Sequence, residues 1–166
     1  MSNGSGDYVE RASEHWRDGQ PLEAGRLLYE QLSPQARAKW ASRILQLVIQ
    51  RSGLQVSAIE HIIRIANDTT KWSEAHRAFS KLRKSTFDLE SLYSQSVKQE
   101  LLLHHLYLAE NVAKVIYNST DPMDEFDEDS GWWVVVCLRG LVDWWNDGVF
   151  SEAAWVTLCS QVEDAP

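Results

Sequence analysis

The chain has 166 residues, of which 44% are hydrophobic and 24% are charged, and its net charge is -8. A chain of this length buries about 70% of the surface that its unfolded state exposes, so we expect one domain with a single core. The longest apolar run, residues 132–138, ends at Arg139. A membrane-spanning helix needs roughly 20 apolar residues, so the sequence predicts no such helix.

The acidic residues are concentrated in the C-terminal part of the chain. Residues 119–166 contain 11 acidic residues against one base, Arg139, for a net charge of -10. Residues 1–118 contain 13 acidic and 15 basic residues, for a net charge of +2. A surface this negative repels nucleic-acid phosphates and anionic lipids, and it attracts basic partners at a rate that depends on salt. We therefore expect a basic protein partner and neither nucleic acid nor a membrane.

The N-terminal residues and the two cysteines indicate the cellular environment. Residues 1–7 have neither the basic start nor the apolar segment of a secretory signal. We expect a flexible leader there, followed by one helical domain over residues 8–163, in the cytoplasm. Cys137 and Cys159 lie in apolar surroundings and form no CxxC pair, so we expect two buried, reduced thiols.

The first elements predict a helical hairpin. Residues 8–17 form a short polar helix that Gly19 ends, and Pro21 begins a second helix that runs to residue 32. The stretch WRDGQPLEAGRLLYEQL, residues 16–32, resembles part of a tetratricopeptide repeat, which implies two antiparallel helices with the Gly between them. No second copy follows at a period of about 34 residues, which favours a generic helical hairpin over a repeat array.

Further helix boundaries follow in the first half of the chain. Ser33 and Pro34 provide an N-cap and a first-turn proline for a third helix, which Gly53 ends. Two more helices are expected after Ser57 and Ser73, with these serines as their N-caps. Apolar residues recur with a period of 3.6 in each of these segments.

A long central helix is expected in the second half of the chain. From Asp88 to Tyr117 apolar residues recur at helical spacing, which predicts one continuous helix with a bend at residues 94–96.

Two helices are expected after it. The pattern of residues 130–146 predicts the first of these helices, although the valine-rich run at 132–138 could also form a buried strand. Ser151 is the expected N-cap of the second. The elements together predict an all-α, single-domain, irregular helical bundle of about seven or eight helices, with an N-terminal helical hairpin and a long central helix.

An acidic loop over residues 118–130 comes directly before the tryptophan-rich helix. The segment DPMDEFDEDSGWWVVVCLRGLVDWW, residues 121–145, places six carboxylates before a run dense in tryptophan and valine. A helix that is apolar on nearly every side is usually buried on nearly every side, so Trp133 and Trp144 could fill the core while the acids form a solvated loop. Alternatively, part of the aromatic surface lies beside a groove with an acidic rim, as in binding surfaces that combine aromatic anchors with charges.

The second interpretation gives a partner-binding site. It consists of five acidic residues and the two tryptophans that follow them: Asp124, Glu125, Asp127, Glu128, Asp129, Trp132 and Trp133. The acidic run lacks the residue order of a calcium-binding helix-loop-helix site. We therefore expect a non-catalytic protein-binding module, possible roles being those of an immunity or adaptor protein that occupies a basic partner.

A helical enzyme or metal-binding protein is the alternative. Glu100 and His104 lie one helical turn apart beside His105, and such groups could share a metal or exchange a proton inside a bundle. However, the ligand spacing is incomplete, and nucleophile motifs and phosphate-binding glycine loops are missing. We expect no cofactor, metal or catalytic residue, with His105 in the core and His104 on the surface.

The segment KWSEAHRAFSKLRK, residues 71–84, is basic. It contains five bases and one acid, and Arg77, Lys81 and Lys84 share one helical face. This face could bind a small anion or an acidic peptide, but we expect it to be solvated and to pair with the acidic loop of the same chain.

Overall fold

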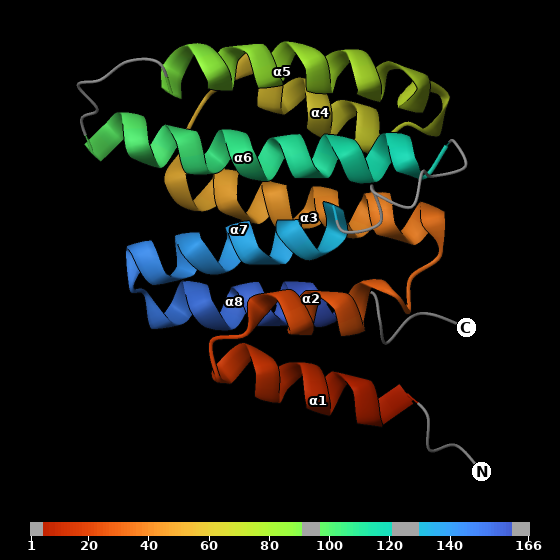
Figure 1. Cartoon of the computed structure of the whole chain (residues 1–166), viewed down its shortest axis with the longest axis vertical. Helices are drawn as coiled ribbons and strands as arrows, with labels where there is room; N and C mark the ends of the chain where they lie inside the picture. Colours follow the sequence, from red (N-terminus) through yellow and green to blue (C-terminus); the bar gives the residue numbers. More distant parts are fainter. Residues whose placement is uncertain (1–4, 91–96, 121–129, 161–166) are drawn as a thin grey trace.

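The computed structural model of the chain describes residues 5–90, 97–120 and 130–160 (Figure 1). These residues form eight α-helices, one 3-10 helix and no β-strand. The elements are α1 (Ser5–Arg17), α2 (Pro21–Tyr29), α3 (Pro34–Ser52), α4 (Ser57–Ala66), η1 (Thr69–Glu74), α5 (Ala75–Glu90), α6 (Val97–Asn118), α7 (Ser130–Trp145) and α8 (Gly148–Cys159). The predicted all-α bundle is therefore confirmed, and residues 132–138 are helical.

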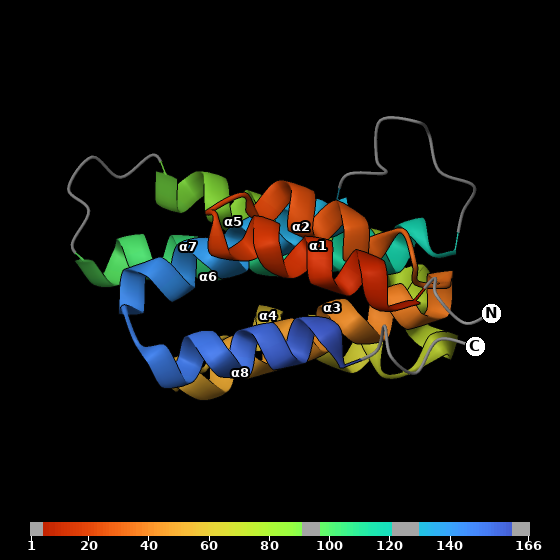
Figure 2. The same cartoon turned by 90° about the horizontal axis from the view of Figure 1, so that it is seen from below.

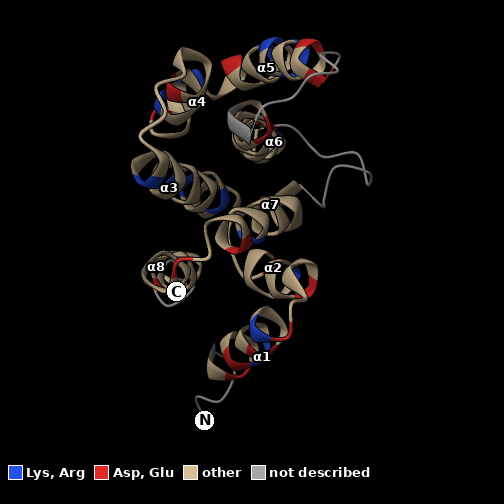
Figure 3. Ribbon diagram, turned by 90° about the vertical axis from the view of Figure 1, so that its left-hand side faces the viewer, with Lys and Arg blue, Asp and Glu red and all other residues tan. Residues whose placement is uncertain are grey.

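The helices lie in two layers (Figure 2, Figure 3). One layer contains α5, α6, α7, α2 and α1 in this order, and the other contains α4, α3 and α8. Neighbouring helices contact one another within the layers, and α3 also contacts α6 and α7 across them. With 22 residues, α6 is the predicted long central helix, and it packs on α5, α7, α3 and α4.

The prediction of one continuous helix from Asp88 to Tyr117 is wrong. α5 ends at Glu90 and α6 begins at Val97, and the two helices run side by side in opposite directions (Figure 1). Both bury an apolar face with the same period, so the spacing of apolar residues continues across the break. Residues 94–96, where a bend was predicted, fall in the segment 91–96 that lies outside the described residues.

Several of the predicted helix boundaries are confirmed. The Ser33 hydroxyl accepts a hydrogen bond from the Ala36 N–H at 3.3 Å, and Pro34 is the first residue of α3. Gly53 ends α3 with a φ of 66°, in the left-handed region that glycine adopts most readily. These boundaries depend on residues within one or two turns, which explains why a local pattern predicts them.

Other boundaries differ from the predicted ones. α1 begins at Ser5, so residues 5–7 of the expected leader are helical. Ser57 is not a cap, because Val56 holds the N-cap position of α4. η1 leads directly into α5 in place of a cap at Ser73.

The final helix also begins earlier than predicted. Asp147, not Ser151, is its N-cap, and its Oδ1 accepts hydrogen bonds from the Val149 and Phe150 N–H groups at 3.0 and 3.2 Å. Asp and Ser are comparable N-caps, so residue preference alone did not distinguish the two positions. The hydrogen bond to the Phe150 N–H is the main reason why the pKa of Asp147 is lowered.

α2 packs closely on α7 through two glycines. A Cβ atom on Gly25 would lie 2.9 Å from the Cβ of Val135, and one on Gly131 would lie 2.2 Å from the ring of Tyr29. Both distances are shorter than carbon atoms tolerate without a shift, so glycine permits this close approach of the two helices. This contact fixes the rotation of α7 about its axis, and hence which of its side chains are exposed.

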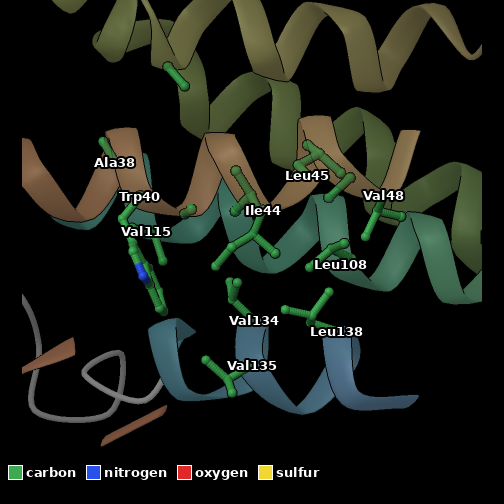
Figure 4. Close-up of a cluster of buried hydrophobic side chains, with 14 of the residues drawn as sticks. Ala38, Trp40, Ile44, Leu45, Val48, Leu108, Val115, Val134, Val135 and Leu138 are labelled. Carbon is green, nitrogen blue, oxygen red and sulfur yellow. The ribbon is translucent and has the colours of Figure 1, made fainter. Parts of the chain in front are cut away.

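The core lies between the two layers and joins α3 to α6 and α7 (Figure 4). The side chains of Trp40, Ile44, Leu108 and Leu138 are fully buried there. Full burial of one such aliphatic side chain contributes about 1.5–3 kcal/mol. The indole Nε1 of Trp40 also donates a hydrogen bond to the Leu158 carbonyl at 2.9 Å, which attaches α8 to α3.

Only part of α7 is buried. Val134, Val135 and Leu138 are fully buried, whereas 45% of Trp133 and 37% of Trp144 is exposed. The interpretation in which both tryptophans fill the core is therefore wrong. Among residues 5–90, 97–120 and 130–160, no helix has the length and apolar character needed to cross a membrane.

Candidate functional site

A strip of aromatic and polar side chains, none of them fully buried, lies along one side of α6 and α7. On α6 these side chains are His104 and the residues three and seven positions later, and on α7 they are Trp133 and the residues four and eleven positions later. This spacing puts them on one side of each helix. We refer to these residues as the α6–α7 face: His104, Tyr107, Asn111, Trp133, Cys137 and Trp144.

Two contacts across the helices hold this face together. The rings of His104 and Trp144 lie 5.6 Å apart between centroids. Two helical turns further along, the Asn111 side-chain amide donates to the Cys137 Sγ at 3.8 Å. Because α6 and α7 are anchored in the core, these contacts present the aromatic side chains on a rigid support.

Two groups on the face titrate outside the physiological range. Burial raises the pKa of the Cys137 thiol to about 12, so the thiol is protonated at neutral pH and is a weak nucleophile. Burial, together with a hydrogen bond from its hydroxyl to the Glu90 carboxylate, raises the pKa of Tyr107 to about 12. Neither group is set up for nucleophilic or acid-base catalysis near pH 7.

The structure describes two of the seven predicted partner-binding residues. Trp133 is exposed on the α6–α7 face. Trp132 is half-buried and packs against the core, and its indole Nε1 has no hydrogen-bond acceptor among the described residues. The five predicted acidic residues lie outside the described residues: Asp124, Glu125, Asp127, Glu128 and Asp129.

The two adjacent histidines of α6 point to different surroundings. His105 is fully buried, its Nδ1 lies 2.7 Å from the Leu101 carbonyl oxygen, and its ring packs on Trp145. Burial lowers the pKa of His105, which favours the neutral imidazole. The core position predicted for His105 is confirmed, while His104 is half-buried against Trp144 instead of lying on an open surface.

The structure does not bring together the side chains that the enzyme or metal alternative requires as ligands. Glu100 is exposed, whereas His105 is enclosed and directs Nδ1 at a backbone carbonyl. Within the described part of the chain, no three His, Cys, Asp or Glu side chains are placed to hold a metal ion together.

A buried carboxylate lies between α5 and α6. Glu110 is only 6% exposed, and the Arg83 guanidinium lies 3.7 Å from its Oε2 and also 3.7 Å from the Glu90 Oε1. Burial raises the pKa of Glu110, although the Thr86 hydroxyl and the charge of Arg83 oppose the shift. The Oε1 of Glu110 has no hydrogen-bond partner among the described residues. One sequence signal points to this group, namely an acidic residue at a core-facing position of an apolar helix.

The basic segment divides between two sides of α5. Arg83 faces the carboxylates of Glu90 and Glu110, whereas Arg77, Lys81 and Lys84 are exposed. Within the described residues, none of these three exposed bases forms an ion pair. Their predicted pairing with the acidic loop involves residues outside the described ranges and stays a prediction.

Comparison of the chain with protein-family models, curated proteins and solved structures gave no match. Conclusions about function therefore rest on the side chains described above.

Proposed function

We propose that this chain is a non-catalytic protein-binding module that uses the α6–α7 face. The observation that carries the proposal is the exposure of Trp133 and Trp144 on the side of α7 away from its core-facing aliphatic residues. Tryptophan and tyrosine are enriched among the residues that contribute most to binding energy, because they bury a large area at low entropic cost.

The rigidity of this face also supports binding. Trp144 packs against His104, and Cys137 is hydrogen-bonded to Asn111, so the side chains lose little freedom when a partner covers them. Association is strongest when few side chains have to be ordered, since each ordered side chain costs about 0.5–1.5 kcal/mol.

The sequence between α6 and α7 also supports the proposal. The Asn118 amide, at the end of α6, donates to the Ser130 hydroxyl, at the start of α7, at 3.4 Å. The segment between these two helix ends, residues 121–129, contains six carboxylates in its sequence and directly precedes α7. Such a charge favours a basic partner and accelerates the encounter. A cytoplasmic immunity or adaptor protein that occupies a basic protein would have these properties.

The contribution of the acidic residues is tested by replacing Asp124, Asp127 and Asp129 with Asn. If they steer a basic partner, the triple variant keeps its melting temperature and associates more slowly with the purified partner, most clearly at low salt. If they pair with Arg77, Lys81 or Lys84 of the same chain, the melting temperature falls and the association rate does not change. The second result would remove the acidic residues from the binding site.

A further inference from the structure

A cavity of about 360 Å³ lies where α4, η1 and α5 meet. Its lining residues are His61 from α4, Ser73 and Glu74 from η1, and Arg77, Ala78 and Lys81 from α5. Figure 3 shows α4 and α5 together at one end of the two layers, with α6, α7 and α2 following along the stack. This cavity is separate from the α6–α7 face, because the two share no residue.

The cationic groups of the cavity have few partners in the protein. Arg77 and Lys81 lie one helical turn apart, where like charges repel each other. Neither forms an ion pair with a described residue, whereas the neighbouring Lys71 lies 3.6 Å from Asp68 and Arg83 contacts two glutamates. Because no described residue neutralises these charges, the repulsion is left to be relieved by solvent, by a bound anion or by the acidic segment of the same chain.

One acidic group also lines the cavity. The Oε2 of Glu74 lies 3.9 Å from the Nε2 of His61, so its charge is directed at the imidazole. The two permanent positive charges of Arg77 and Lys81 exceed the single negative charge of Glu74. Residues 1–118 as a whole carry a net charge of +2, so this part of the chain does not share the negative field of the C-terminal part.

We infer that this cavity binds the phosphate group of a small molecule. A guanidinium binds phosphate oxygens with two parallel hydrogen bonds, an ammonium adds a point charge, and the Ser73 hydroxyl offers a neutral donor. The volume falls within the range of about 300–1,000 Å³ that is usual for small-molecule sites, and it exceeds what a phosphate ion alone fills. The expected ligand is a phosphate monoester. The limited size of the cavity favours such a small molecule over a nucleic acid.

The test measures binding of inorganic phosphate and of glycerol 3-phosphate by isothermal titration calorimetry, with chloride at the same ionic strength as a reference. The wild-type chain is compared with the variant R77Q/K81Q. A matched control is K39Q/R43Q, because Lys39 and Arg43 are exposed on α3 at the same spacing but do not line the cavity. All four positions are exposed, so circular dichroism should show an unchanged fold for both variants.

The wild-type chain and the control should bind both phosphate compounds, and R77Q/K81Q should lose on the order of tenfold or more in affinity. Tighter binding of glycerol 3-phosphate than of inorganic phosphate supports a monoester, and equal binding would contradict that assignment. Equal losses in both variants, or binding no stronger than that of chloride, would overturn the site. So would phosphate binding that appears only when Asp124, Asp127 and Asp129 are replaced with Asn, because the acidic segment of the chain would then be the natural occupant.

Discussion

The imidazole of His104 packs against the indole of Trp144 with the ring centroids 5.6 Å apart. This contact joins the central helix α6 to the exposed side of α7, and it fixes a large aromatic side chain at the surface. Trp144 stays 37% exposed despite the contact, so its side chain is not enclosed in the core.

Replacing Trp133 or Trp144 with Ala should destabilise the protein less than replacing a core tryptophan, since more than a third of each side chain is already exposed. Replacing Trp40, which is fully buried and bonded to Leu158, should cost about 3–5 kcal/mol. Urea denaturation of the three variants measures the difference. A loss at Trp144 as large as the loss at Trp40 would show that Trp144 belongs to the core.

The close contact of α2 and α7 predicts different outcomes for two glycines of the same helix. Gly131→Ala forces a methyl group into the Tyr29 ring and should cost about 1–3 kcal/mol. Gly140→Ala, with open space around the new methyl group, should stabilise α7 by up to about 1 kcal/mol through higher helix propensity. Thermal unfolding of both variants checks this, and equal changes in melting temperature would contradict the packing described here.

Glu110 should make the protein less stable as the pH rises. Burial raises its pKa above the ordinary value of 4.5, so the folded chain holds the proton more tightly than the unfolded chain does. The stability from this group is complete below pH 4.5 and is lost as the pH passes through the raised pKa.

Glu110→Gln keeps the size of the side chain but cannot ionise. This variant should therefore melt at a higher temperature than the wild type at pH 8, and the difference should shrink towards pH 4. The exposed Glu100→Gln on the same helix serves as the control for the loss of one carboxylate. A Glu110→Gln variant that is less stable at pH 8 would mean that the ion pair with Arg83 outweighs burial.

His105 should have the opposite pH dependence. Burial lowers its pKa below the ordinary value of 6.5, so the folded chain binds the proton more weakly than the unfolded chain. The contribution of the neutral imidazole to the free energy of unfolding is present above pH 6.5. It is lost as the pH falls through the lowered pKa of His105. His105→Leu should lose less stability between pH 7 and pH 5 than the wild type does, and thermal unfolding at both pH values measures this difference. Identical melting curves for His105→Leu and the wild type at every pH would rule out this role of His105.

The fold class and several boundaries could be predicted from the sequence because they depend on neighbouring residues. Ser33 and Gly53 act on the first and last turns of α3, and Arg139 pairs with Asp143 four positions later, at 3.0 Å. The break between Glu90 and Val97 could not be predicted in this way, because the apolar period of α5 continues into α6.

The exposed side of α7 could not be predicted either. α7 is apolar on nearly every side, so its sequence does not rank one side above another. The rotation is fixed by contacts with distant segments, above all by the approach of Tyr29 and Gly25 on α2. The arrangement of Glu90 and Glu110 around Arg83 is also a long-range property, since it requires the antiparallel pairing of α5 and α6.

The central claim is that Trp133 and Trp144 anchor a protein partner, and affinity capture with the whole chain as bait tests it most directly. The partner is first identified by mass spectrometry from a lysate of the source organism, then purified, and its affinity is measured for the wild-type chain, W133A/W144A and V149A/V156A. The valines of α8 are a matched control, because they are also exposed, at 82% and 57%. We predict that W133A/W144A stays folded and loses on the order of a hundredfold in affinity, while V149A/V156A binds like the wild type. Equal affinity of all three chains, or a loss only in the α8 variant, would contradict the proposed binding face.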